Sequence, residues 1–254
     1  MPSKLSLPTS QMQPGKKQRS QTLSKIPCYL NPSHKTTYLT KDVIWCDICK
    51  HGLSIHRFRP GIYGEDYAEH YRECMMLPMS KPLQAFRSAF LQRSVPRSCK
   101  RLLDFGCGTG AFCRSACKHY TTFGYDINHY YQTTWREDAS PITYSTKLQD
   151  QPYDVVTFFD SLEHVQDPVN LIKFLSSVKV FIVSLPVMEK TAWPSSRHLK
   201  PLEHLHYFTF TSIFKLFAKC GYALTTFSEG ETILGRQDIL TFAFRKWRPA
   251  TKLQ

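Results

Sequence analysis

The pattern of apolar positions divides the chain into a polar beginning and a longer, regularly patterned remainder. Residues 1–25 are rich in Ser, Gln, Pro and Lys and nearly lack large apolar residues. They cannot bury enough surface to offset the entropy lost on ordering, so we predict a disordered basic tail over 1–25. Residues 26–62 then carry short β-like pieces at 36–39 and 43–45 among cysteines and histidines, which indicates a small separate module.

Helical spacing of apolar side chains follows over residues 63–98. The apolar residues that recur at this spacing are Tyr67, Tyr71, Leu83, Phe86, Phe90 and Leu91. Pro78 and Pro82 fall within the stretch and are expected to break it into two helices. These helices are expected to cover one end of a main domain over 99–248, which is followed by a tail over 249–254.

From Arg101 onward, strand-like and helix-like segments alternate, which is typical of a mostly parallel sheet covered by helices. The last two strands are joined only by the loop 228–237, so we expect an antiparallel hairpin at the sheet edge. The predicted class is α/β and Rossmann-like. Strands are predicted at 101–105, 121–126, 154–159, 179–185, 222–227 and 238–245, and helices at 110–119, 168–176 and 211–219.

The net charge of +13 is concentrated at the two ends of the chain. Residues 1–41 hold seven Lys or Arg and no acid, and residues 245–254 hold four more basic residues. The rest of the chain is nearly neutral, with 22 basic and 20 acidic residues. The tails could bind RNA through screened contacts that are independent of sequence, or they could serve only solubility.

Targeting and redox features point to a protein of the cytoplasm. No apolar run approaches the roughly 20 residues that span a bilayer, so no membrane partner is expected. The first residues also lack the apolar stretch of a secretory signal. The nine cysteines are odd in number and scattered, and they show no disulfide framework.

A glycine-rich turn, DFGCGTG at residues 104–110, follows the first predicted strand of the main domain. Ligands of open α/β sheets bind at such strand ends, and glycine allows the unusual dihedral angles of the turn and close approach of a nucleoside. Dinucleotide folds use Gly-x-Gly-x-x-Gly to hold a pyrophosphate, whereas position 111 is Ala here. The spacing therefore favours S-adenosylmethionine (SAM), which has no phosphate.

Two acids support this interpretation. Asp104 lies under the turn, and Asp126 ends the next predicted strand, where a carboxylate can accept hydrogen bonds from both ribose hydroxyls. The residues predicted to bind the cofactor are Asp104, Phe105, Gly106, Cys107, Gly108, Gly110, Asp126, Ile127, Asp160 and Ser161.

Three segments resemble the class I SAM-dependent methyltransferase superfamily. They are LDFGCGTG at 103–110, YDVVTFFDSLEHV at 153–165 and HLHYFT at 204–209. The resemblance covers roughly residues 63–245 and is strongest to the small-molecule branch of ubiquinone-biosynthesis O-methyltransferases and sugar methyltransferases. It implies a Rossmann-like methyltransferase fold that uses SAM. It does not specify the acceptor, because the same pattern occurs in enzymes that methylate oxygen, nitrogen or carbon.

Methyl transfer from a sulfonium is an in-line displacement for which a protein supplies alignment, a dry cleft and sometimes a base. His164 follows the strand at 154–159, and a near-neutral imidazole suits deprotonation of an acceptor hydroxyl. It could instead pack over the cofactor or cap the next helix. His204 and His206 compete for the base role, because the long loop 186–208 is interpreted as an acceptor lid, or else as an ordinary surface insertion.

Cys46 and Cys49 have the Cys-x-x-Cys spacing of a zinc knuckle, which needs a second pair of ligands. The predicted structural zinc site uses Cys28 and His34 for that pair, with His51 and His56 as alternatives. Similar methyltransferases usually carry two Cys-x-x-Cys pairs in such a module, whereas this chain has one. Two buried thiols in a hairpin are the other interpretation.

These observations favour an enzyme that transfers a methyl group from SAM to a small-molecule or sugar-type acceptor, most readily at oxygen. One alternative is an RNA methyltransferase whose basic tails and zinc module hold the nucleic acid. Another is a non-catalytic module that binds SAM and acts by association.

Overall fold

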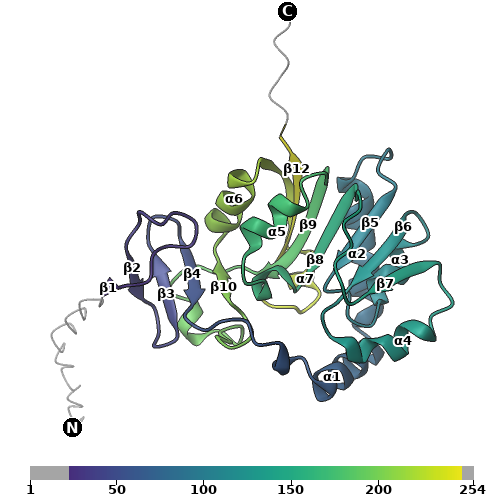
Figure 1. Ribbon diagram of the computed structural model, residues 1–254, viewed down its shortest axis with the longest axis horizontal. Helices are drawn as coiled ribbons and strands as arrows, with labels where there is room; N and C mark the ends of the chain where they lie inside the picture. The colour runs from purple at the N-terminus through teal and green to yellow at the C-terminus, as the bar shows by residue number, and fades with distance from the viewer. Residues whose placement is uncertain (1–22, 248–254) are drawn as a thin grey trace, which may run out of the picture.

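The computed structural model describes residues 23–247, which form a small sheet beside a larger α/β domain (Figure 1). Nearly all of the tail predicted over 1–25, and the whole tail over 249–254, lie outside the described residues. Within residues 23–247, no helix is both long enough and apolar enough to cross a membrane.

The large domain is built on a seven-stranded sheet with the order β11-β12-β9-β8-β5-β6-β7. Strands β9, β8, β5, β6 and β7 run parallel, and β11 and β12 form an antiparallel hairpin at one edge. The predicted α/β fold is confirmed. The strands are β5 (Arg101–Phe105), β6 (Thr121–Tyr125), β7 (Ile142–Ser145), β8 (Val155–Phe159), β9 (Val180–Pro186), β11 (Tyr222–Ser228) and β12 (Ile239–Lys246).

Alternating apolar side chains on the central strands build a core on each face of the sheet. Leu103 and Val156 pack on the side covered by α5 and α6, whereas their neighbours Leu102 and Val155 pack on the side covered by α2 and α3. The side chains alternate because successive residues of a strand point to opposite faces. The covering helices are α2 (Ser80–Ser94), α3 (Ala111–Ala116), α5 (Pro168–Phe174) and α6 (Phe210–Lys219).

Two helices precede the large sheet, as predicted, but only one of the two prolines separates them. Helix α1 (Glu65–Met76) ends before Pro78, and α2 begins at Ser80. The prediction that Pro82 also breaks the stretch was wrong. Pro82 lies in the first turn of α2, where backbone N–H groups have no hydrogen-bond partner within the helix. Because proline only lacks this unpaired N–H, it is tolerated there without breaking the helix.

Several short elements were not predicted. Strand β7 pairs with β6 at the second edge of the sheet, and α4 (Gln132–Arg136) precedes it. The loop predicted over 228–237 contains the short helix α7 (Gly230–Ile233). These segments are only a few residues long and lack a clear apolar period, which is why the sequence pattern did not reveal them.

The small sheet combines the Cys/His module with a strand from far along the chain. Its strands are β1 (Leu23–Ser24), β2 (Thr36–Tyr38), β3 (Val43–Cys46), β4 (His51–Ser54) and β10 (His206–Phe208). Strand β10 pairs antiparallel with β4, so the segment interpreted as an acceptor lid ends in the strand that completes this sheet. Trp193 from the same segment is buried against Trp45 and Tyr207.

Candidate functional site

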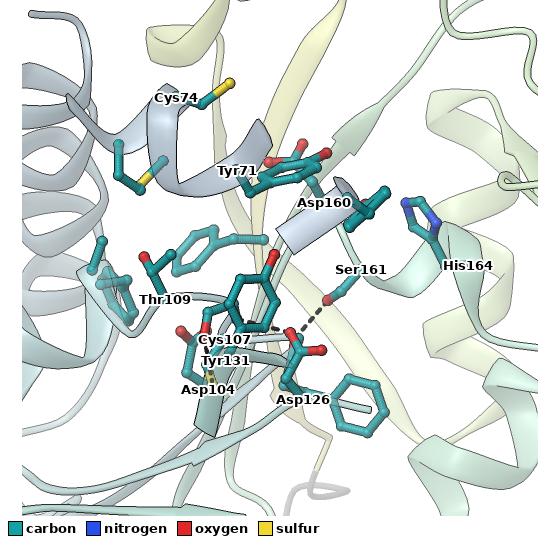
Figure 2. Close-up of a pocket in the computed structure, with 18 of the residues that line it drawn as sticks. Tyr71, Cys74, Asp104, Cys107, Thr109, Asp126, Tyr131, Asp160, Ser161 and His164 are labelled. Atoms are coloured by element: carbon teal, nitrogen blue, oxygen red, sulfur yellow. Dashed lines mark hydrogen bonds between the residues drawn. The ribbon is translucent and has the colours of Figure 1, made fainter. Parts of the chain in front are cut away.

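A cavity of about 570 Å³ lies where the parallel strands end. It sits beside β5, which pairs with β6 on one side and β8 on the other, the point where strand order reverses and ligands of such sheets bind. All of the predicted cofactor-binding residues except Gly110 line it. Figure 2 shows Tyr71, Asp126 and His164 around this space.

The glycine turn has the backbone that its sequence predicts. Gly106, Gly108 and Gly110 have φ angles of 80°, 52° and 78°, in the left-handed region that glycine occupies without strain. An added Cβ at Gly106 would lie 2.6 Å from the Cβ of Ser161. The Ser161 side chain therefore excludes any side chain at residue 106. At Gly108 an added Cβ would meet nothing closer than the Tyr131 ring at 3.8 Å, which leaves bare backbone facing the cavity.

Asp126 fits the ribose-binding role predicted for it. Its Oδ2 accepts a hydrogen bond from the Gly108 N–H at 2.8 Å, and its Oδ1 accepts one from the Asn128 N–H at 2.8 Å. Each carboxylate oxygen keeps a lone pair for a ligand hydroxyl. Burial raises the pKa of Asp126 to about 6.

Asp104 is buried under the turn at the wall of the cavity. It accepts hydrogen bonds from the Thr157 hydroxyl at 2.6 Å and from the Cys113 thiol at 3.5 Å. Burial also raises the pKa of Asp104 to about 6. Both acids that the sequence singled out therefore lie at one cavity, close to the glycine turn.

Asp160 belongs to a buried ion network that sequence reasoning missed. Arg87 donates to Asp160 at 2.9 Å and to Glu231 at 2.8 Å, and Arg236 bridges the same two carboxylates. Although burial opposes ionisation, Arg236 and Arg87 hold the pKa of Asp160 below its usual range. Arg87 could have been suspected because it is a charged residue between Leu83 and Phe90 on the apolar face of its helix.

Three tyrosines, Tyr63, Tyr67 and Tyr71, form what we name the tyrosine wall of the cavity. The rings of Tyr63 and Tyr67 lie edge to face with centroids 5.0 Å apart, and those of Tyr67 and Tyr71 are stacked at 4.7 Å. For Tyr67 and Tyr71 the spacing of four residues was the available signal, since side chains four apart share one helix face, whereas Tyr63 precedes the helix. The wall gives the cavity an aromatic side.

His164 lies at the cavity on the short helix η3 (Leu162–His164). Its Nδ1 is 2.9 Å from the Tyr63 hydroxyl, and burial lowers its pKa to about 4, so the imidazole is neutral at physiological pH. It does not cap α5, because the Asp167 carboxylate accepts from the Asn170 N–H there.

The other two candidate histidines are placed differently. The His204 ring lies 4.8 Å from that of His164 but does not line the cavity, and burial lowers the pKa of His204 to about 3. His206 lies in the small sheet, where its Nδ1 is 3.2 Å from the Nε2 of His51. The structure therefore brings His164 and His204 together, and His206 does not line the cavity.

Glu163 lies close to both His164 and His204. It is only 2% exposed, its Oε1 lies 3.8 Å from the His164 Nε2, and its Oε2 has no hydrogen-bond partner among the described residues. Burial and the nearby charge of Asp160 raise its pKa. Donor atoms of Glu163, His164 and His204 all lie within 4.8 Å of one another.

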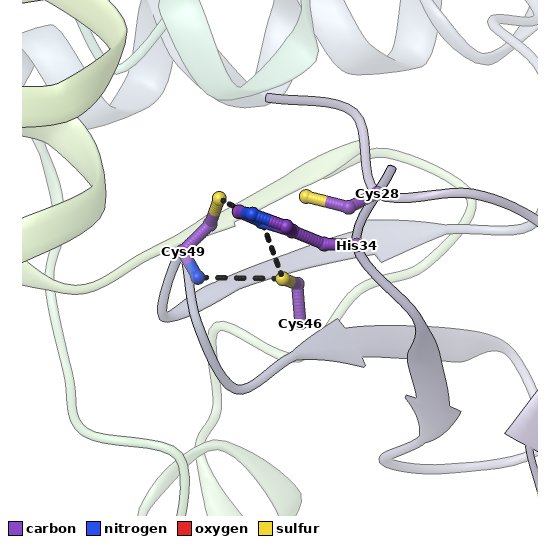
Figure 3. A group of neighbouring side chains, drawn as sticks. All are labelled: Cys28, His34, Cys46 and Cys49. Carbon is purple, nitrogen blue, oxygen red and sulfur yellow. Dashed lines mark hydrogen bonds between the residues drawn. The ribbon is translucent and has the colours of Figure 1, made fainter. Parts of the chain in front are cut away.

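The predicted zinc ligands also come together (Figure 3). Donor atoms of Cys28, His34, Cys46 and Cys49 lie within 4.8 Å of one another, with the His34 Nδ1 3.3 Å from the Cys49 sulfur and 3.8 Å from the Cys46 sulfur. Ligands at 2.0–2.3 Å around a tetrahedral zinc are separated by roughly 3.3–3.8 Å, so the four residues fit this ion.

The alternative zinc ligands have other partners. His51 pairs with His206, and the His56 Nε2 lies 3.1 Å from the Asp42 carboxylate. Neither belongs to the group formed by Cys28 and its neighbours.

The family model of the methyltransferase domain matches residues 69–226, more than half of the chain. The chain belongs to the methyltransferase-domain family. The expected enzyme class, a SAM-dependent methyltransferase, is thereby confirmed. The matched residues include the glycine turn, Asp126 and His164, whereas the Cys/His module precedes them.

Solved methyltransferases share the fold of this methyltransferase at low identity. Magnesium protoporphyrin IX methyltransferase from Synechocystis PCC 6803, with bound S-adenosylhomocysteine, has a TM-score of 0.52 at 17% identity, over 66% of this chain and 84% of that one. A SAM-dependent methyltransferase from Thermotoga maritima, a possible histamine N-methyltransferase, has a TM-score of 0.54 at 14% identity, over 74% of this chain and all of that one.

A chain from the complex of the Haloferax volcanii Trm112 methyltransferase activator with a methyltransferase has a TM-score of 0.56 at 13% identity, over 72% of this chain and 97% of that one. No curated protein is significantly similar in sequence. At these identities the similarity concerns the fold, and the acceptors of these proteins do not carry over.

Proposed function

We propose that this methyltransferase transfers the methyl group of SAM to a hydroxyl oxygen of a small-molecule or sugar-type acceptor in the cytoplasm. The observation that carries the proposal is the single cavity of about 570 Å³ that joins the glycine turn and Asp126 to the tyrosine wall and His164. Cavities of this size take small molecules that are largely enclosed. We still predict that its nearest relatives are the ubiquinone-biosynthesis O-methyltransferases and sugar methyltransferases.

In the proposed reaction an acceptor oxygen attacks the methyl carbon of SAM in line with the sulfur. A carbon–oxygen bond forms, the carbon–sulfur bond breaks, and its electron pair neutralises the sulfonium to give S-adenosylhomocysteine. The hydroxyl proton leaves to a base or to solvent. Because little else is needed, alignment and exclusion of water are the main contributions of the protein.

Each end of the cavity has a proposed task. The bare backbone at Gly106 and Gly108 would lie against the adenosine, and the Asp126 carboxylate would accept hydrogen bonds from the ribose hydroxyls. The tyrosine wall would stack on a flat or sugar ring of the acceptor. His164, neutral and beside this wall, is the group that we place at the acceptor hydroxyl.

The experiment is incubation of the purified protein with methyl-labelled SAM and fractionated cell extract, with or without nuclease treatment. We expect label in a small-molecule fraction that is insensitive to nuclease, and a methyl ether in the mass spectrum of the product. As a matched pair, His164→Ala should lose turnover at saturating acceptor, whereas His198→Ala, outside the cavity lining, should retain it.

Other results would identify the alternatives. Label that nuclease removes would show an RNA acceptor and overturn the small-molecule proposal. Tight SAM binding without label in any fraction would instead support the non-catalytic module.

We also propose that Cys28, His34, Cys46 and Cys49 hold one structural zinc ion. Three of the four side chains are buried, and burial raises the pKa of Cys49 to about 12, so the Cys49 thiol would remain protonated unless a cation stabilises its thiolate. A module with so small an apolar core gains stability from such an ion.

A further inference from the structure

We infer that Arg236 and Arg87 bind an oxyanion of the acceptor, a carboxylate or a phosphate, at the end of the cavity away from Asp126. The inference rests on the proposed function and narrows its acceptor to a hydroxylated small molecule that carries a negative charge. Arg236 would then determine which acceptors bind, while the reacting hydroxyl lies elsewhere on the same molecule.

The two guanidinium groups keep N–H groups that have no partner. Arg236 donates to Asp160 and to Glu231 through one nitrogen, Nη1, so its Nε and Nη2 have no hydrogen-bond partner in residues 23–247. Arg87 uses Nε and Nη2 for the same two carboxylates, which leaves its Nη1 without a partner in that range. None of these unpaired nitrogens is fully buried, so each is open to a ligand.

The open space beside these groups is the cavity, because Arg87, Asp160 and Arg236 all line it. The Arg236 side chain is 29% exposed and that of Arg87 only 8%, so Arg236 is the more accessible of the two. The free Nε and Nη2 of Arg236 lie along one edge of its planar guanidinium. Such an edge binds a carboxylate or a phosphate through two parallel hydrogen bonds.

Arg236 lies on the side of the sheet away from the proposed ribose site. The loop 229–238, which carries it, joins β11 to β12, and Ile239 at the start of β12 pairs with Pro186 at the carboxyl end of β9. In the strand order, β8 and β5 separate β9 from β6, whose end is followed by Asp126. An anion at Arg236 and a ribose at Asp126 would therefore occupy opposite ends of the cavity.

The loop that carries Arg236 is fixed by its own contacts. The Arg236 N–H donates to the Glu231 carbonyl at 2.9 Å, and the Gln237 carbonyl lies 3.1 Å from the His198 Nε2. Although burial opposes the charge, Asp160 and Glu231 raise the pKa of Arg236, so its guanidinium stays positive. A cation held in this way loses little freedom when it binds an anion, and the sulfonium of bound SAM further favours an anion nearby.

The test uses two pairs of small hydroxylated probes that differ in charge: lactate with lactamide, and glycerol 3-phosphate with glycerol. Each probe is titrated into protein loaded with S-adenosylhomocysteine, which prevents turnover, and binding is followed by ligand-observed NMR. We expect the charged member of at least one pair to bind at least about tenfold more tightly than its neutral partner. The pair that shows the larger preference identifies the oxyanion as carboxylate or phosphate.

The variant Arg236→Lys assigns the preference to this side chain. It keeps a positive charge beside Asp160 and Glu231 but lacks the edge with two N–H donors, so the preference for the charged probe should fall below about threefold. Its Kd for SAM should change less than about threefold, which also shows that the variant is folded. The matched control is Arg197→Lys, which is exposed and outside the cavity lining and should keep the full preference.

Equal binding of charged and neutral probes by the wild type would overturn the inference, as would a preference that Arg236→Lys retains. Loss of SAM binding in Arg236→Lys would assign the free N–H groups to the carboxylate of the cofactor and would also overturn it. A methyl-labelled product that is uncharged would contradict the inference but support the proposed function. Preference for a charged probe in a protein that methylates nothing would do the reverse.

Discussion

At the scale of single residues, the ionisation of Asp126 should control cofactor affinity. Burial raises its pKa to about 6, and only the carboxylate can accept from both ribose hydroxyls. As pH falls below 6 the proton must be lost before SAM binds, so the Kd for SAM should rise about tenfold per pH unit. Calorimetric titration between pH 5 and 8 measures this.

Burial also raises the pKa of Asp104 to about 6. The variant Asp126→Asn separates the effect of Asp126 ionisation on SAM binding from the effect of Asp104 ionisation. It should bind SAM about 10- to 100-fold more weakly at pH 7.5, because hydrogen bonds to a charged acceptor are lost. The Kd for SAM of this variant should depend less steeply on pH than that of the wild type. The pH dependence that remains should disappear in the variant that also carries Asp104→Asn. An unchanged affinity would remove Asp126 from the ribose site.

The buried ion network is the second residue-scale test. Glu231 is fully buried between Arg87 and Arg236, so Glu231→Gln leaves two guanidinium groups with Asp160 as their only carboxylate partner among the described residues. Breaking such a network should lower the free energy of unfolding by about 3 kcal/mol, measured by urea denaturation. Exposed Glu229→Gln should change it by less than about 0.5 kcal/mol. Equal effects would contradict a structural role for the network.

At the scale of elements, the turn that begins α3 depends on two properties of Gly110. Its φ of 78° disfavours any side chain, and an added Cβ would also collide with the Tyr144 hydroxyl. Gly221 after α6 has a φ of 84° but open space around it. Gly221→Ala should therefore lower the free energy of unfolding only by the backbone strain, about 1–2 kcal/mol. Gly110→Ala should lower the free energy of unfolding by at least about 1 kcal/mol more.

Urea denaturation of the two variants, compared with the wild type, measures the difference. The collision between an added Cβ at residue 110 and the Tyr144 hydroxyl can be relieved by combining Gly110→Ala with Tyr144→Phe. This double variant should recover part of the lost free energy of unfolding. Equal losses in the two glycine variants would show that Tyr144 moves aside freely.

At the scale of the whole molecule, the proposed zinc should stabilise the small sheet without controlling the cofactor site. Trp45 and Trp193 are each 1% exposed beneath this sheet, whereas Asp126 and the glycine turn belong to the large sheet. Removing zinc with a chelator should shift tryptophan emission to the red as water reaches these rings, while the Kd for SAM changes less than about threefold.

Two cysteine variants provide the control. Cys46→Ser should show the red-shifted emission without chelator and contain no bound zinc in this module, whereas Cys74→Ser, on α1 and outside the cluster, should resemble the wild type. Purified protein that contains no zinc, or emission that a chelator leaves unchanged, would contradict the proposed ion.

The sequence by itself determined the features that depend on neighbouring residues. The alternation of strands and helices indicated the parallel sheet and its edge hairpin, because side-chain period and connection length decide those locally. The glycine turn and Asp126 were found in the same way, since a strand, a tight turn and an acid on the next strand lie close in sequence as well as in space.

Only the tertiary structure decided which distant polar groups meet. Arg87 and Glu231 are 144 positions apart, and β4 pairs with β10 across a similar separation. Glu163 and His204 come together for the same reason. No period along the chain specifies such pairs, because a buried charge takes as its partner whichever group the packed elements bring within hydrogen-bond distance.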